Sequence, residues 1–231
     1  MALPKMDIPT FELELPSSGK KVKYRPFLVK EHKLLMMMKN AEGPDISKIV
    51  GDLITACTFG KVDGFTIPST DAEYLFLNIR ARSIGEIYDF IINCECGNKI
   101  DASANIDDLI VVKPEGHKTK IALSDSIGVE MEYPVFGSVL NVYQSDDTEA
   151  TFEMINSCIK AVYTPEEYTE IDENNKEELK TFIEGLTKEQ FDKIEAFFVT
   201  MPFIKQVVTK KCDKCEKENI VEIRGLENFF I

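Results

Sequence analysis

Two pairs of closely spaced cysteines, far apart in the chain, constrain the fold more than any other feature of this sequence. Cys94 and Cys96 form a Cys-x-Cys pair that Gly97 follows, and Cys212 and Cys215 form a Cys-x-x-Cys pair near the end of the chain. Each pair can supply two thiolates, and four thiolates complete the tetrahedral coordination that zinc adopts in structural sites. Gly97 permits the positive φ of a sharp turn. The sequence therefore predicts a four-cysteine metal site.

Each cysteine pair lies between two short segments with the composition of β-strands. Residues 87–93 and 100–106 flank the first pair, and residues 206–209 and 220–223 flank the second. Both regions therefore have the layout of a β-hairpin with the cysteines in its turn. Two such hairpins that face one another build a zinc ribbon, so we expect the two cysteine pairs to be neighbours in space.

Other thiol chemistry is open for the same cysteines, which could form disulfides, act as a redox dithiol or be unrelated buried thiols. A closed four-thiolate site leaves no coordination position for water, so it would stabilise the fold without performing chemistry. We therefore expect zinc as a structural cofactor. The remaining cysteines, Cys57 and Cys158, occur within apolar helical patterns and are expected to be small buried core residues.

Length and charge limit the class of protein and of partner. The chain has 231 residues, of which 44% are hydrophobic, enough for one substantial core or two modest ones. It shows no signal-peptide pattern and no apolar run near the ~18 residues of a membrane span, so we expect a cytosolic protein without membrane contact. The formal net charge is −13. Nucleic-acid binding depends on lysine and arginine at phosphates, so this charge disfavours nucleic acid and favours protein partners.

The hydrophobic pattern predicts an α+β fold. Alternating segments at 11–15 and 22–24, separated by a turn-rich stretch, predict an N-terminal β-hairpin, and residues 117–123 and 127–134 predict a second antiparallel pair. The acidic tract 166–178 has few apolar residues and is expected to be a solvated loop. The expected helices are residues 29–39, 46–58, 69–83, 148–163, 176–184 and 188–199.

These elements divide the chain into parts that we expect to pack as one compact unit. Residues 1–86 hold the N-terminal hairpin and helices. Residues 87–145 and 203–231 form a β-rich region with the cysteine hairpins, which joins the middle of the chain to its end, and residues 146–202 form a helical insertion. The apolar segment 226–231 is expected to be buried or offered to a partner.

Motifs that indicate catalysis are missing from the sequence. It contains no phosphate-binding P-loop, no nucleophile elbow and no His-Glu-x-x-His helix. Its two histidines, His32 and His117, are expected to be surface or partly buried polar residues, and its carboxylate pairs fall in polar loops. We therefore expect a protein that is not an enzyme.

Several segments spread over most of the chain carry a family resemblance. They are residues 15–31 (LPSSGKKVKYRPFLVKE), residues 75–86 (LFLNIRARSIGE), the central cysteine pair and residues 129–134 (VEMEYP). Together they resemble the baseplate proteins of T-even-type contractile-tailed phages. That family is associated with the central hub of the tail baseplate, so the resemblance implies a hub subunit or hub assembly protein that binds other phage baseplate hub proteins and has no enzymatic activity. It would be located in the host cytoplasm during assembly and in the virion tail baseplate. The zinc prediction rests on the cysteines of this sequence and not on the resemblance.

Two other functions remain as alternatives. A zinc-ribbon module associated with nucleic acid would bind DNA or RNA in a salt-sensitive manner. A thiol redox protein would show reversible oxidation of Cys212 and Cys215 with no bound metal.

Overall fold

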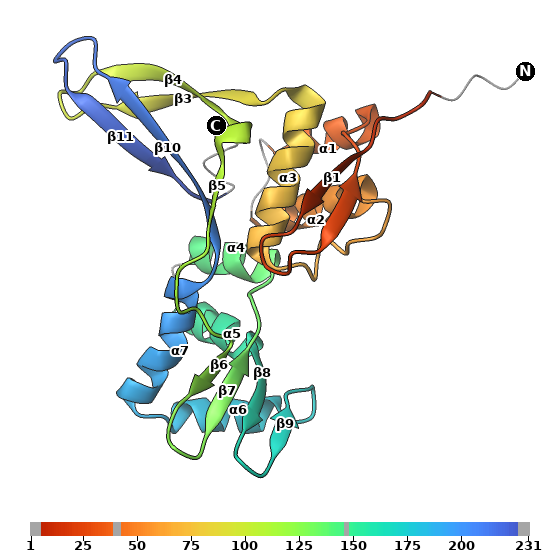
Figure 1. The fold of residues 1–231 in the computed structure, drawn as a ribbon, viewed down its shortest axis with the longest axis vertical. Coiled ribbons are helices and arrows are strands. Elements are labelled where there is room, and N and C mark those ends of the chain that lie inside the picture. The colour runs from red at the N-terminus through yellow and green to blue at the C-terminus, as the bar shows by residue number, and fades with distance from the viewer. Residues whose placement is uncertain (1–5, 39–42, 146–147, 226–231) are drawn as a thin grey trace, which may run out of the picture. The chain divides into compact units, whose positions relative to one another are not determined.

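The chain divides into two compact units in the computed structural model. Residues 1–112 and 203–231 form one unit, here called the cysteine unit, and residues 113–202 form the other, here called the inserted unit (Figure 1). The predicted burial or partner contact of 226–231 lies outside the described residues. No helix in the described part of the chain is long and apolar enough to cross a membrane. The structure describes residues 6–38, 43–145 and 148–225.

The cysteine unit combines a helical core with antiparallel hairpins. Strand β1 pairs with β2, β3 pairs with β4, and a further sheet has the order β11-β10-β5. The helices are α1 (Val29–Met38), α2 (Gly43–Cys57) and α3 (Ser69–Ile84), with a short 3₁₀ turn η1 (Ile106–Asp108). The strands are β1 (Phe11–Glu14), β2 (Lys21–Tyr24), β3 (Ile87–Asn93), β4 (Lys99–Asn105), β5 (Ile110–Val112), β10 (Phe203–Lys211) and β11 (Glu218–Ile223).

Helices α2 and α3 supply the core of the cysteine unit. On α2, Val50, Leu53, Ile54 and Cys57 are fully buried. Their spacing of three and four residues places them on one face of the helix, which is why the segment folds as an amphipathic helix. Cys57 is thus a core residue, as predicted. Helices α1, α2 and α3 agree with the expected helices in this part of the chain.

The inserted unit is a four-stranded antiparallel sheet with helices. The sheet has the order β6-β7-β8-β9, and helices α5, α6 and α7 lie on one face of it (Figure 1). The strands are β6 (Lys120–Ala122), β7 (Gly128–Met131), β8 (Ile159–Tyr163) and β9 (Tyr168–Glu170). The helices are α4 (Phe136–Ser145), α5 (Thr148–Ser157), α6 (Lys176–Glu184) and α7 (Lys188–Thr200).

The core of the inserted unit forms where the sheet meets these helices. Helix α7 begins with a capping box, in which the side chains of Thr187 and Gln190 bond reciprocally to backbone N–H groups. Cys158 is buried in the core, as predicted. The buried cluster consists of Leu123, Val129, Met131, Ile155, Cys158, Ile159, Leu179, Ile183, Ile194 and Phe197.

The α+β class is confirmed, but two local predictions were wrong. The helix expected over 148–163 ends at Ser157, and the rest of that segment forms β8 because it pairs with β7. The acidic tract 166–178 is not entirely loop, since it contains β9 and the first turn of α6. Strand β5 and helix α4 were not predicted.

The division of the chain also differs from the expected one. Residues 117–134 were expected with the cysteine hairpins, and a helical insertion was expected to begin at 146. Because β7 pairs with β8, these residues instead belong to the same unit as the helices that follow, and that unit begins at Lys113. The insertion is therefore a mixed α/β unit, and the chain forms two compact units where one was expected.

Candidate metal centre

The first cysteine pair occupies the turn between β3 and β4. The strands pair in register up to Asn93 and Lys99. Beyond them, the Cys94 N–H donates to the Asn98 carbonyl over 2.9 Å, and the Gly97 N–H donates to the Cys94 carbonyl over 2.8 Å. Gly97 has φ of +81°, which a glycine adopts without steric cost. The predicted glycine turn is confirmed.

The second cysteine pair occupies the equivalent turn between β10 and β11. The Cys212 N–H donates to the Lys217 carbonyl over 2.8 Å, and the Glu216 N–H donates to the Cys212 carbonyl over 2.9 Å. Glu216 has φ of +59°, the left-handed conformation that costs an L-residue about 1–2 kcal/mol. Both turns therefore contain a residue at positive φ shortly after the first cysteine, although only one of them is a glycine.

A buried hydrogen-bond network joins the two hairpins. The Tyr88 hydroxyl on β3 donates to Gln206 Oε1 on β10 over 2.8 Å, and Gln206 Nε2 donates to the Asn105 carbonyl at the end of β4 over 2.7 Å. Burial raises the pKa of Tyr88 to about 12, so the hydroxyl keeps its proton and remains a donor. The hairpins consequently lie side by side, with their cysteine turns at the same end (Figure 1).

The four cysteine sulfurs form one cluster. Cys94 Sγ lies 3.6 Å from Cys215 Sγ, and Cys96 Sγ lies 3.8 Å from Cys212 Sγ. All four sulfurs lie within 4.8 Å of one another. A tetrahedron with Zn–S bonds of about 2.3 Å has sulfur–sulfur edges of about 3.8 Å, so the cluster has the dimensions of a four-thiolate metal site. The predicted proximity of the two cysteine pairs is confirmed.

Interactions within the cluster shift the pKa values of Cys212 and Cys215 in opposite directions. Backbone N–H groups of Cys215 and Lys214, with the side-chain amide of Asn98, lower the pKa of Cys212 to about 6. The backbone N–H of Lys217 lowers the pKa of Cys215, but contacts with the neighbouring thiols outweigh it and raise that pKa to about 12. Close thiolates repel one another, so a cation among them favours ionisation of the full set.

Residues around the sulfurs complete the arrangement. Asn98 Nδ2 lies 3.6 Å from Cys212 Sγ, and Lys217 Nζ lies 2.5 Å from the Glu95 carboxylate, which ties one cysteine turn to the other. Sequence reasoning missed these contacts, because nothing in the spacing of Asn98, Glu95 or Lys217 marks them as partners. Hydrogen bonds to coordinating groups orient them and tune their affinity for a metal.

The geometry limits the chemistry of the cluster. The sulfur separations exceed the roughly 2.05 Å of a disulfide, so the cysteines are free thiols in this arrangement. Cys94 and Cys212 are buried, with 4% and 1% of their surface exposed, whereas Cys96 and Cys215 are exposed. Four protein ligands fill a tetrahedral site and leave no position for a substrate or an activated water. The cluster can hold a metal as a structural element.

Neither histidine is a member of this cluster. His32 is exposed on α1. His117 belongs to the inserted unit, where its ring packs 5.0 Å from the Phe197 ring centroid and its Nδ1 lies 3.0 Å from Thr200 Oγ1. Burial lowers the pKa of His117 and favours a neutral ring.

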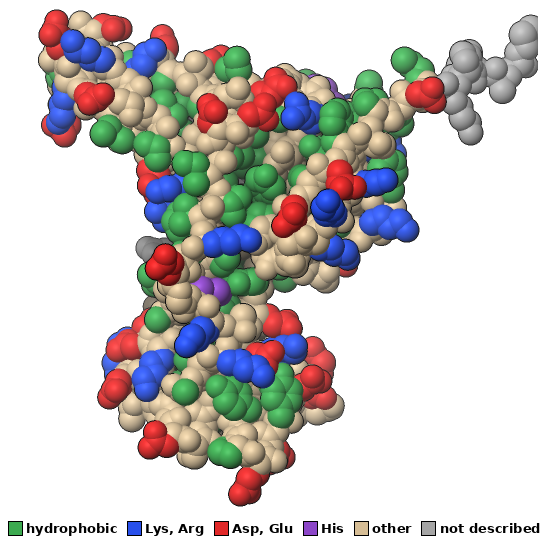
Figure 2. All heavy atoms as spheres, viewed as in Figure 1, with side chains coloured by type: hydrophobic (Ala, Val, Ile, Leu, Met, Phe, Trp, Pro, Cys, Tyr) green, Lys and Arg blue, Asp and Glu red, His purple; other side chains and the backbone are tan. Residues whose placement is uncertain are grey.

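One comparison with known proteins gives a match. A family model described as T4 bacteriophage base plate protein matches residues 8–231, nearly the whole chain. No curated protein and no solved structure matches the chain significantly. The match gives no support to a zinc-ribbon module for nucleic acid, and acidic side chains are interspersed with the basic ones on the face in Figure 2.

Proposed function

The chain belongs to the T4 bacteriophage base plate protein family, and we propose from this that it is a subunit or an assembly protein of the baseplate hub. The observation that carries the proposal is the length of the family match, which covers residues 8–231 and therefore both units. A protein of this kind works by presenting surfaces to other phage structural proteins. Its partners would be other hub proteins, in the host cytoplasm during assembly and in the virion tail.

We propose zinc as a structural cofactor bound by the two cysteine pairs. The sulfur separations of 3.6 and 3.8 Å support this assignment, because they agree with a tetrahedral four-thiolate site. The metal would link two hairpins that lie on opposite sides of the inserted unit in the sequence. It would thereby hold together the middle and the end of the chain, and with them the surfaces that partners contact.

We propose that the protein is not an enzyme. The candidate metal centre supports this, because a site closed by four thiolates offers no position at which a substrate could react. A metal in this site would contribute to folding stability rather than to turnover.

The test is genetic and biochemical. Removing the gene from the phage that encodes the protein should prevent the formation of complete baseplates, and supplying the protein from a plasmid should restore them. Electron microscopy of the lysates would show the difference. Complete, infectious tails in the absence of the protein would contradict the proposal. Mass spectrometry of purified particles would then distinguish a hub subunit, which stays in the virion, from an assembly protein, which does not.

A further inference from the structure

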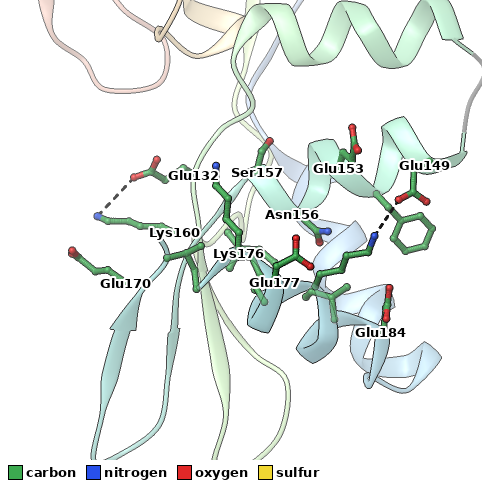
Figure 3. A pocket seen from close by; sticks show the side chains of 16 residues that line it. Glu132, Glu149, Glu153, Asn156, Ser157, Lys160, Glu170, Lys176, Glu177 and Glu184 are labelled. Carbon is green, nitrogen blue, oxygen red and sulfur yellow. Dashed lines mark ion pairs between the residues drawn. The ribbon is translucent and has the colours of Figure 1, made fainter. Parts of the chain in front are cut away.

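A groove in the inserted unit lies between α5, α6 and the strands β8 and β9 (Figure 3). Its volume is about 890 Å³, and apolar side chains from both helices and from the sheet line it. Phe152 is the most exposed of the apolar lining residues, and Leu179 and Ile183 are buried where α6 meets the core. The groove therefore offers an apolar floor that is open on one side.

The lysines of the groove are already neutralised by partners within the inserted unit. Lys180 Nζ lies 3.5 Å from the Glu149 carboxylate, and Lys176 Nζ lies 2.6 Å from the Glu173 carboxylate. Lys160 Nζ contacts the carboxylates of both Glu130 and Glu132, at 3.6 and 3.9 Å. Figure 3 shows the pair of Lys160 with Glu132 at the edge of the groove.

Other glutamates of the groove have no such partner. They carry no ion pair within the described part of the chain, so their charge faces solvent and is available to a ligand. The unpaired set consists of Glu153, Glu170, Glu177 and Glu184. The rim of the groove therefore carries a net negative charge even when the glutamates that pair with lysines are left out.

The position of Glu184 is not explained by local helix preferences. Glu184 lies in the last turn of α6, where the helix dipole favours a cation and disfavours a carboxylate. Asn156 also lines the groove, and its Oδ1 atom is buried without a hydrogen-bond partner among the described residues. A buried acceptor without a partner costs roughly 1–3 kcal/mol.

We propose that this groove binds a basic amphipathic helix of another protein. Apolar side chains of that helix would cover the floor, and its lysines and arginines would lie over the unpaired glutamates. The side chains of α5 and α6 that line the groove would make the contacts, as in other helix-in-groove complexes. A second copy of this chain is a poor fit, because the formal net charge of −13 opposes self-association.

The inference rests on the proposed function in one respect, which is that the protein acts through contacts with other proteins. It adds the place of one such contact and the chemistry of the partner. The groove belongs entirely to the inserted unit, whereas the candidate metal centre belongs to the cysteine unit. A test on purified protein can therefore fail without affecting the baseplate assignment, and the genetic test can fail without affecting the groove.

The test uses a fluorescent synthetic helix of about 18 residues, long enough to be helical, with leucines on one face and lysines on the other. Anisotropy titration at about 0.15 M salt, where the Debye length is about 8 Å, should give saturable binding with one peptide per chain. The variant Glu153→Lys/Glu184→Lys should weaken binding by about tenfold or more, because close charge pairs dominate such contacts. Neither substitution removes an ion pair, and Lys at 184 suits the end of α6.

The matched control is Glu115→Lys/Glu166→Lys. It changes the net charge of the inserted unit by the same amount at exposed positions outside the groove. It should alter affinity by less than about twofold, because it leaves the charges that line the groove unchanged. Equal weakening by both double variants would overturn the proposal, since the peptide would then respond only to net charge.

A second peptide separates this ligand from a simple polycation. It keeps the lysines and replaces the leucines by serine, and it should bind at least about tenfold more weakly because it cannot cover the apolar floor. Equal binding of the two peptides would mean that the groove recognises polycations, and it would overturn the proposal. Absence of binding by the amphipathic peptide would also overturn it.

Discussion

Cys94 Sγ lies 3.6 Å from Cys215 Sγ, although the two residues are 121 positions apart in the chain. The intervening sequence includes the whole inserted unit. A cross-link at this point closes a long loop, and in the chain-entropy account a link over about 100 residues removes roughly 4–5 kcal/mol of conformational freedom from the unfolded state. A metal that bridges the four sulfurs would therefore act on the stability of the whole cysteine unit.

Removal of one ligand should destabilise that unit. We expect Cys96→Ser and Cys215→Ser each to lower its free energy of unfolding by roughly 4 kcal/mol, because an incomplete site holds zinc weakly and the cross-link is lost. Urea unfolding of zinc-loaded protein measures the change. The control is Glu95→Gln, which removes a surface ion pair with Lys217 and should cost less than about 1 kcal/mol. Equal stability of the serine variants and the control would contradict the structural role.

The turn that presents the first cysteine pair makes a separate prediction. Gly97→Ala places an L-residue at φ of +81° and should cost roughly 1–2 kcal/mol, with weaker zinc retention. Apart from Gly97 and its two chain neighbours, no atom of the described residues lies within 4 Å of the added methyl group, so the cost comes from the backbone conformation. Gly185→Ala is the control, since Gly185 has φ of −83° and should accept alanine without loss. If Gly97→Ala left both stability and zinc retention unchanged, the turn would be able to relax to another conformation, which would contradict the prediction.

A buried ion pair should anchor the start of α1. Arg25 Nη2 lies 2.9 Å from Glu31 Oε1, and their side chains are only 6% and 3% exposed. Glu31→Gln leaves a buried guanidinium without a counter-charge and should cost about 3–5 kcal/mol in thermal or urea unfolding. The exposed pair of Lys21 and Glu12 gives the control, because Glu12→Gln should cost less than about 1 kcal/mol. Similar losses for the two variants would contradict this account.

Protonation of His117 should destabilise the inserted unit. Burial lowers its pKa in the folded state below the unfolded value of about 6.5, so the unfolded chain takes up the proton first as the pH falls. The contribution of neutral His117 to the free energy of unfolding is complete above pH ~6.5. It declines below that pH, with a slope of at most about 1.4 kcal/mol per pH unit. NMR titration of the imidazole should give a pKa below about 6.5, and His117→Gln should flatten the decline. His32→Gln, at an exposed position on α1, should leave it unchanged.

The candidate metal centre could be predicted from the sequence because each cysteine turn is specified by residues close to it in the chain. Each cysteine pair sits in a turn between two strand-like segments, and Gly97 indicates the conformation of the first turn. The approach of the two turns followed from the similarity of their layouts. The second turn shows the limit of this reasoning, since Glu216 adopts positive φ without the glycine that would predict it.

The errors in the fold arose where pairing over long distances decides the structure. The apolar positions of α5 continue without a break into Ile159, so periodicity alone extends the helix beyond Ser157. Strand β8 forms because β7 and β9 lie on either side of it. Strand β9 was hidden in the same way, because its Tyr168–Glu170 segment is exposed and acidic and becomes a strand only by pairing with β8.

The most direct test of the account is the zinc content of the folded protein. Metal analysis after purification without added metal should give about one zinc per chain, since a closed four-thiolate site binds zinc tightly at neutral pH. The result that would contradict the account is a fully folded chain that contains no metal and whose clustered cysteines react freely with thiol reagents.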